Sequence, residues 1–115
     1  MSGYDMGDGG CDLKFPSYVS TGGSMIATAE DTGRFLRALI EGTLFSDEEQ
    51  SIYSSVYEYE HTGLLPGYQS IARYHENVDA VVVQFTNMSG ENRWMRSEAI
   101  YRRIVRILRR DWRRT

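Results

Sequence analysis

The residue types that could do chemistry gather at few places in this chain. His61, Thr62 and Gly63 follow one another at the end of an alternating segment, and Pro66-Gly67 comes shortly after them. A ring nitrogen, a hydroxyl and backbone N–H groups beside a residue without a side chain could contact a polar or anionic ligand. An ordinary edge strand that ends in a turn accounts for the same residues. The choice between the two interpretations depends on the elements around the triplet.

The sequence predicts neither a metal site nor a cofactor. The single cysteine, Cys11, with His61 and His75 is too sparse a set for zinc, which usually takes paired, closely spaced ligands. The aspartates among the glycines of residues 5–12 do not follow the spacing of a calcium-binding loop. A lone cysteine also excludes an internal disulfide.

Length and composition are those of a soluble globular protein. The chain has 115 residues, of which 41% are hydrophobic and 25% charged, so we expect a single domain or a fragment of one. The longest apolar run, Ala80 to Val83, is far shorter than the roughly 20 residues that cross a bilayer, so no membrane span is predicted. The first five residues have neither the basic region nor the apolar core of a signal peptide.

The net charge of −3 conceals a division between the two halves of the chain. Residues 1–60 hold eleven acidic and three basic residues, a net charge of −8, whereas residues 61–115 hold five acidic residues and ten arginines, a net charge of +5. Opposite net charges predict that the two halves attract one another when they pack.

The first half of the chain predicts a loop followed by helices. Residues 1–24 are rich in Gly, Asp and Ser without periodicity, which is typical of loop. Thr28 and Asp31 have the spacing of a capping box, so a helix should begin there and end at Gly42. Its apolar stripe has helical spacing and consists of Thr32, Phe35, Leu36, Leu39 and Ile40.

A second cap opens a short helix. Ser46 and Glu49 have capping-box spacing, and the helix should run to about Tyr53, which places the helices within residues 28–53.

Three antiparallel strands are predicted over residues 56–87. The first begins at Val56, alternates through an acidic face, and suits a sheet edge. Pro66-Gly67 suits a type II turn to the second strand, residues 68–74, and a polar turn leads to the third, residues 79–86. Short connections make the strands a meander. The third strand is almost continuously apolar, so we expect it in the interior of the sheet.

Residues 92–114 predict the longest helix. Its apolar side should cover the sheet and consists of Trp94, Tyr101, Ile104, Val105, Leu108 and Trp112, with Ile100 and Ile107 beside it. Arginines populate the opposite side. They could bind nucleic acid or an anionic membrane surface, but a solvated face with apolar arginine stems over the core is the commoner arrangement, and we expect no nucleic acid partner. The predicted fold class is therefore α+β.

Several of these segments resemble one family in order and spacing. The C-terminal part of the class C β-lactamase and penicillin-binding-protein-like serine hydrolases is similar to residues 20–108 of this chain. The segments that carry the resemblance are Gly22–Asp31, Arg34–Gly42, His61–Gly63, Pro66–Tyr68 and Val81–Asn87. The resemblance implies a partial β-lactamase/transpeptidase-like α/β sandwich, and relatives in this family are often extracytoplasmic.

The resemblance also implies roles for the triplet, which matches the family's K-T-G or H-x-G strand. His61 and Thr62 would line the pocket and contact the polar or anionic end of a small acyl substrate. Gly63 would let the substrate approach closely. The backbone N–H of Leu64 would be one of two oxyanion donors. Histidine in place of lysine favours esterase-like or peptidase-like relatives over true β-lactamases, because histidine is a weaker anchor for a carboxylate near neutral pH.

The chain departs from the family at the nucleophile. Lys14 is the only lysine, and an S-x-x-K motif would need serine where Cys11 stands. Cys11-Asp12-Leu13-Lys14 mimics that motif but lies just upstream of Gly22-Gly23, whereas the family's nucleophile comes far earlier and on a helix. No Tyr-x-Asn occurs in the chain. We therefore expect a C-terminal segment of a serine hydrolase that is inactive alone. The alternative is a non-catalytic module that binds a partner or itself through sheet edges or the arginine-rich helix.

Overall fold

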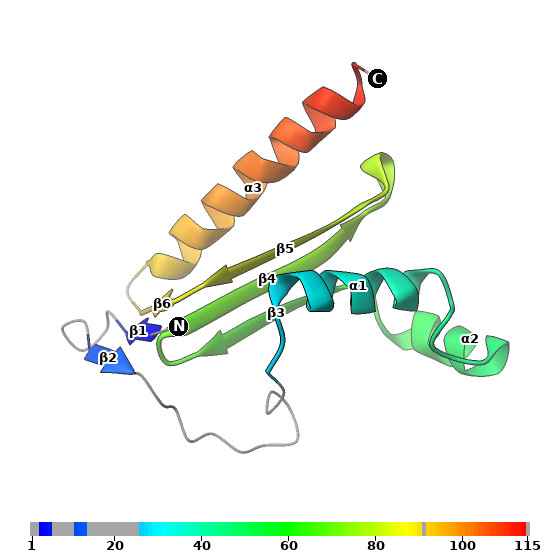
Figure 1. Cartoon of the computed structure of the whole chain (residues 1–115), viewed down its shortest axis with the longest axis horizontal. Coiled ribbons are helices and arrows are strands. Elements are labelled where there is room, and N and C mark those ends of the chain that lie inside the picture. Colours follow the sequence, from blue (N-terminus) through cyan, green and yellow to red (C-terminus); the bar gives the residue numbers. More distant parts are fainter. Residues whose placement is uncertain (1–2, 6–10, 14–25, 91, 115) are drawn as a thin grey trace.

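The computed structural model describes residues 3–5, 11–13, 26–90 and 92–114, with side chains for the last two ranges. The fold is α+β, as predicted. Its helices are α1 (Ala29–Ile40), α2 (Asp47–Val56) and α3 (Arg93–Trp112), and its strands are β1 (Gly3–Asp5), β2 (Cys11–Leu13), β3 (Glu60–Leu65), β4 (Tyr68–His75), β5 (Ala80–Thr86) and β6 (Met88–Ser89) (Figure 1).

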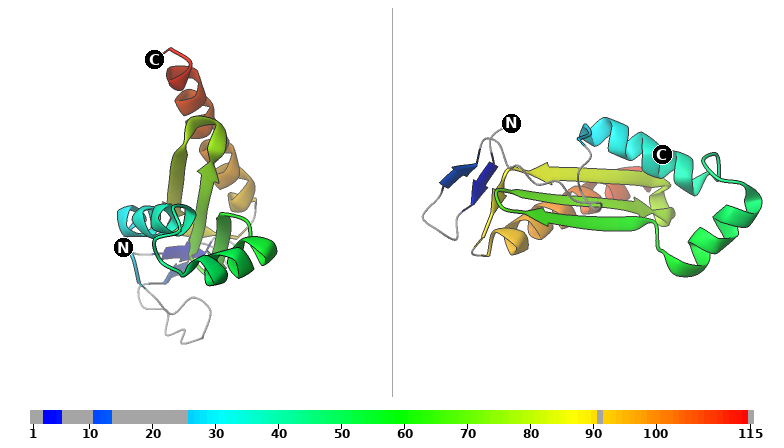
Figure 2. Two further views of the ribbon diagram at one scale, coloured as in Figure 1. Left: turned by 90° about the vertical axis from the view of Figure 1, so that its right-hand side faces the viewer. Right: turned by 90° about the horizontal axis from the view of Figure 1, so that it is seen from below.

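The main sheet is the predicted antiparallel meander. Its strand order is β3-β4-β5, and the residue partners run from Glu60 opposite Arg73 to Leu65 opposite Tyr68 along β3. Helices α1 and α3 lie on opposite faces of this sheet, which the left view of Figure 2 shows along the strands. The sheet is therefore the middle layer between two helices.

A second small sheet corrects the prediction that residues 1–24 are loop. Strand β1 pairs antiparallel with β2 and parallel with β6, in the order β2-β1-β6. These strands are only two or three residues long. Such short segments carry too few side chains to produce a recognisable alternation, and the pairing of β1 with β6 joins residues far apart in the sequence.

The predicted start of the first strand is wrong. Val56 is the last residue of α2, and β3 begins at Glu60. The helix continues past Tyr53 because the Tyr57 N–H donates to the Tyr53 carbonyl at 2.9 Å and the two rings stack at 5.1 Å. Aromatic side chains four residues apart are neighbours on a helix, and this contact prevails over the alternating pattern.

The predicted position of the third strand is also wrong. Strand β5 lies at an edge of the meander, and β4 occupies the interior. A nearly continuous apolar sequence indicates that both faces of a strand are covered, which α1 and α3 do for β5. The apolar sequence carries no information about whether the strand has a neighbouring strand on each side.

The core lies mainly between the sheet and α3. Its buried residues are Ile71 of β4, Val82 of β5, and Tyr101 and Val105 of α3, with Trp94 packed against them. The predicted apolar side of α3 is only partly buried. Ile104 remains exposed because it lies on a flank of α3 and not on the side toward the sheet. Leu108 and Trp112 remain exposed because the C-terminal part of α3 runs beyond the sheet (Figure 1).

The two predicted caps and the predicted turn are present. The Asp31 N–H donates to Thr28 Oγ1 at 3.0 Å, and Ser46 and Glu49 form a complete capping box. Gly67 has the positive φ of +81° that a type II turn requires. The Gly67 N–H also donates to the buried Ser89 Oγ at 2.7 Å, which ties this turn to β6.

Among the described residues, no helix is both long enough and apolar enough to cross a membrane.

Candidate functional site

The His-Thr-Gly triplet lies on β3, at one open edge of the sheet. His61 is opposite Ala72, Thr62 opposite Ile71 and Gly63 opposite Ser70. No strand of the described residues pairs with the other side of β3. His61 and Thr62 are exposed, and Leu64 is 65% exposed. The triplet is therefore accessible from the side of the sheet.

The backbone direction at Leu64 follows from the pairing of β3 with β4. The Tyr74 N–H donates to the Tyr59 carbonyl at 3.0 Å, and these two residues continue the β3–β4 register. In an antiparallel pair, hydrogen-bonded and non-hydrogen-bonded positions alternate. Positions 61, 63 and 65 therefore bond to β4, whereas the N–H groups of Thr62 and Leu64 point away from it, toward the open edge.

The side chains of the triplet do not share a face. Because successive side chains of a strand point to opposite faces, His61 and Gly63 lie on the α1 side of the sheet. Thr62 lies on the α3 side, together with its partner Ile71. Only a ligand that runs alongside the edge would contact both His61 and Thr62.

The glycine at position 63 has a packing reason independent of any ligand. A Cβ atom built at Gly63 would lie 2.5 Å from Ser70 Oγ on the neighbouring strand. Real Cβ atoms do not approach so closely, so the Ser70 side chain would have to rotate. Packing against Ser70 therefore favours glycine at this position without any ligand.

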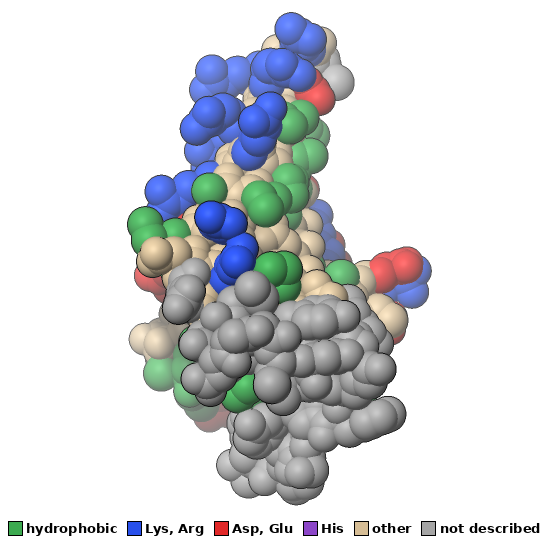
Figure 3. Space-filling model, turned by 90° about the vertical axis from the view of Figure 1, so that its left-hand side faces the viewer, with side chains coloured by type: hydrophobic (Ala, Val, Ile, Leu, Met, Phe, Trp, Pro, Cys, Tyr) green, Lys and Arg blue, Asp and Glu red, His purple; other side chains and the backbone are tan. Residues whose placement is uncertain are grey.

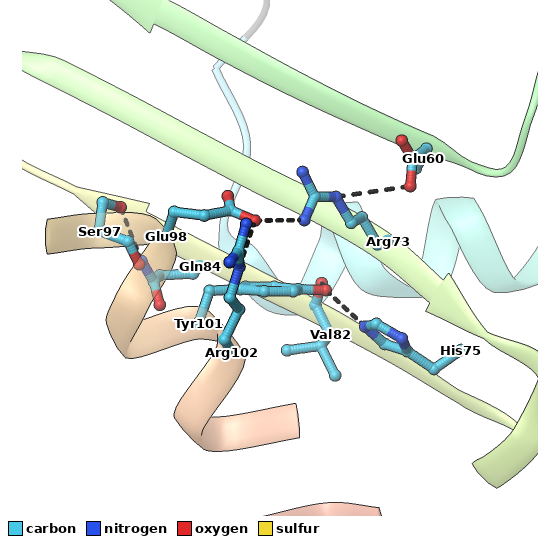
Figure 4. A network of polar contacts seen from close by, with 9 residues as sticks. All are labelled: Glu60, Arg73, His75, Val82, Gln84, Ser97, Glu98, Tyr101 and Arg102. Carbon is cyan, nitrogen blue, oxygen red and sulfur yellow. Dashed lines mark hydrogen bonds and ion pairs between the residues drawn. The ribbon is translucent and has the colours of Figure 1, made fainter. Parts of the chain in front are cut away.

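A polar network on the α3 face lies next to this edge and was not predicted. Arg73 of β4 donates from Nη1 to Glu98 Oε1 of α3 at 2.8 Å, and its Nε lies 3.5 Å from Glu60 Oε2 of β3 (Figure 4). The guanidinium also lies over the Tyr101 ring, 5.3 Å from its centroid. Arg73 thereby links β4 to both β3 and α3.

The network shifts the pKa of its members. The hydrogen bond to Glu98 raises the pKa of Arg73, and the same bond lowers the pKa of Glu98. Burial raises the pKa of Tyr101 to about 12. Burial, together with the nearby charges of Arg109 and Arg73, lowers the pKa of His75. The shifts favour an ionised Arg73–Glu98 pair and neutral Tyr101 and His75.

The buried hydroxyl of Tyr101 joins α3 to both β4 and β5. It lies 2.8 Å from His75 Nε2 and 3.4 Å from the Val82 carbonyl, to which it donates (Figure 4). Tyr101 is 1% exposed. A substrate could not reach this hydroxyl, so the His75–Tyr101 pair holds the helix on the sheet.

An open groove of about 410 Å³ follows the network along α3. Its lining joins Arg73, His75, Glu98 and Tyr101 to Arg102, Val105, Arg106 and Arg109. Figure 3 shows arginine side chains gathered along α3 with hydrophobic side chains exposed among them. The groove is positively charged and solvated, which suits attraction of anions in general. It does not include His61, Thr62, Gly63 or Leu64.

Little in the sequence signals this network. Arg73 and Glu98 are 25 positions apart in different elements, and their contact exists only after α3 docks. Glu60 and Arg73 become partners only through the β3–β4 register.

The nucleophile-like segment Cys11-Asp12-Leu13-Lys14 lies only partly within the described residues. Cys11 belongs to β2, which pairs with β1 in the small sheet, and Lys14 lies outside the described residues. Among the described residues, no group of three or more His, Cys, Asp or Glu side chains converges as a metal site would require.

Comparison of the chain with models of known families, with curated proteins and with solved structures found no match.

Proposed function

We propose that this chain is the C-terminal segment of a β-lactamase-like serine hydrolase and that β3 forms one wall of its acyl-substrate site. The single observation that carries the proposal is the direction of the Leu64 N–H. It faces the open edge of β3 directly after His61-Thr62-Gly63, where a substrate carbonyl alongside the strand could accept its hydrogen bond.

The role of Leu64 is electrostatic. A backbone N–H that is fixed by a strand and aimed at a developing oxyanion stabilises the transition state more than the ground state. Its fixed direction costs no reorganisation during the reaction. The second donor and the attacking serine would come from a nucleophile-bearing segment that approaches the β3 edge.

His61 and Thr62 would orient the substrate. The exposed His61 imidazole on the α1 side and the Thr62 hydroxyl on the α3 side flank the Leu64 N–H. Both can hydrogen-bond a carboxylate or carbonyl oxygen of a small ester, amide or β-lactam. One donor without a nucleophile performs no acyl transfer, so the chain alone should be inactive.

The first test is activity. The purified chain should hydrolyse neither nitrocefin nor p-nitrophenyl acetate above the buffer rate, and a fluorophosphonate probe should label no serine. Stoichiometric labelling of a serine would contradict the proposal, because it would place the nucleophile within this chain.

The second test uses the alternation of β3 as an internal control. Methylphosphonate, a tetrahedral anion, should shift the amide resonances of Thr62 and Leu64 in a titration followed by NMR. The amides of Gly63 and Leu65, which bond to β4, should shift less. With a single donor we expect a dissociation constant of about 1 mM or weaker, equivalent to roughly −4 kcal/mol. Shifts confined to α3 would contradict a site on β3.

A second candidate function, self-association, is favoured by a different observation. The apolar strand β5 also has an open edge among the described residues, and exposed isoleucines of α3 lie beside it.

A further inference from the structure

The rotation of α3 about its axis is fixed by two adjacent residues. The Ser97 hydroxyl contacts Gln84 and Thr86 of β5, whereas Glu98 pairs with Arg73 of β4. Successive helical residues are turned by about 100°. One flank of α3 therefore faces β4 and β3, and the other lies on the β5 side.

The two flanks have different chemistry. The flank toward β4 and β3 carries Arg102, Arg106 and Arg109, which line the groove. The opposite flank carries Ile100, Ile104 and Ile107, which are 58%, 38% and 45% exposed. These three side chains form an apolar surface beside β5 and next to its open edge, which we call the isoleucine flank.

The backbone of β5 offers hydrogen bonds beneath this flank. Because β4 uses positions 68, 70, 72 and 74 to bond β3, its other positions bond β5, and these are opposite residues 80, 82, 84 and 86. The N–H and carbonyl groups of Val81, Val83 and Phe85 therefore point to the open edge. Among the described residues, no strand pairs with them.

We propose that this edge and the isoleucine flank together bind a second copy of the chain about a two-fold axis. The β5 strands would pair antiparallel, with Val81 of each copy opposite Val83 of the other. The core residues Tyr101 and Val105 of α3 pack on both Ile71 of β4 and Val82 of β5, so the helix lies roughly midway between these strands. With strands about 4.8 Å apart, the two α3 helices would lie about 10 Å apart, which is a normal helix-packing distance.

The isoleucine flank is self-complementary in this arrangement. Tyr101 donates to the Val82 carbonyl, so the axis at Val82 passes α3 near residues 101 and 102. Two antiparallel helices related by such an axis place Ile100 opposite Ile104 of the second copy. They also place Arg93 opposite Asp111 of the second copy, since each is nine positions from residue 102. Arg93 has no ion pair among the described residues, and its Nε is buried without a partner there.

This contact leaves both β3 edges free, at the two ends of a six-stranded sheet. The proposal deepens the second candidate function, self-association, and is independent of the proposed hydrolase role, so either can fail alone. Two-fold symmetric dimers, in which the same surface of each copy meets its counterpart, are the commonest oligomers of soluble chains.

The oligomeric state tests the proposal. Sedimentation velocity should show a monomer–dimer equilibrium, and Ile104→Arg should raise the dimer dissociation constant by more than about tenfold, because it places like charges near the axis. Ile52→Arg is the matched control, since Ile52 is 60% exposed on α2 and lies outside the contact. A monomer at all concentrations, or equal effects of both variants, would overturn the proposal.

A charge swap between Arg93 and Asp111 and a hydrogen-exchange measurement test the register of the proposed dimer. Arg93→Asp and Asp111→Arg should each weaken the dimer, and the double variant should recover it. Hydrogen exchange of the Val81 and Val83 amides should slow as protein concentration rises, while that of the Thr62 and Leu64 amides should not. Protection at Thr62 and Leu64 instead would place the contact on β3 and overturn the proposal.

Discussion

The two edge strands of the meander, β3 and β5, differ in almost every respect except that both are open among the described residues. Strand β3 carries exposed polar side chains, and both His61 and Thr62 are accessible. Strand β5 is almost continuously apolar and has a helix over each face. An edge with solvated side chains suits a small polar ligand, whereas an apolar edge beneath apolar helix flanks suits another polypeptide.

The largest expected effect comes from truncating one apolar side chain on each edge. Val82 is 8% exposed in the core under α3, whereas Leu64 is 65% exposed. Val82→Ala should lower the free energy of unfolding by about 2 kcal/mol, through lost burial and the cavity that remains. Leu64→Ala should change it by less than about 0.5 kcal/mol. Urea denaturation measures both, and equal losses would mean that the edges are equally buried.

A smaller effect is expected from the two acidic partners of Arg73. Glu98 of α3 has a side chain that is 16% exposed, whereas the Glu60 side chain on β3 is 51% exposed. Glu98→Ala should destabilise the chain by about 1–2 kcal/mol, because Arg73 then loses its close hydrogen-bond partner in a partly buried site. Glu60→Ala should cost less than about 0.5 kcal/mol, as exposed ion pairs do.

Urea denaturation of the Glu98→Ala and Glu60→Ala variants measures this difference in stability. Repeating both substitutions in an Arg73→Met background should abolish the difference between them. A difference that persists without Arg73 would show that Glu98 acts through other contacts.

The smallest expected effect is on the pH dependence of stability. Burial and neighbouring arginines hold the pKa of His75 below its ordinary value of about 6.5 when the chain is folded. The unfolded chain therefore binds the proton more readily. The stability that this difference provides is fully present above pH 6.5 and is lost as the pH falls through the folded pKa.

A substitution separates this contribution from acid unfolding in general. His75→Gln should flatten the decline in unfolding free energy between about pH 6.5 and pH 5, measured by urea denaturation at each pH. His61→Gln on the exposed β3 edge is the control and should change the profile less. A steeper decline in His75→Gln would contradict the assigned shift.

The sequence predicted the elements whose signals are local. The caps at Thr28 and Ser46, the turn at Gly67 and the order of three antiparallel strands are each encoded within a few neighbouring residues. The strand with the His-Thr-Gly triplet was placed at an edge because one face of the segment is acidic. Its predicted ligand contacts stay predictions.

The predictions that failed did so for three different reasons. The contact between Tyr53 and Tyr57 extends α2 into the segment that was expected to be a strand. Strand β5 lies at an edge and not in the interior, because an apolar sequence indicates only that the two faces of a strand are covered. The small sheet that β1 and β2 form with β6 has strands too short for a periodic signal.

By itself, the sequence determined the α+β class, the meander and the identity of the triplet at its edge, because periodicity and turn chemistry act over a few residues. Only the tertiary structure decided which way the Leu64 N–H points, since that depends on the β3–β4 register. It also decided that Arg73 joins Glu60, Glu98 and Tyr101. It decided as well that α3 turns Ile100, Ile104 and Ile107 toward the β5 side and Arg102, Arg106 and Arg109 toward β4 and β3. Those facts follow from how the strands are registered and how the helix is rotated on the sheet, which no single segment encodes.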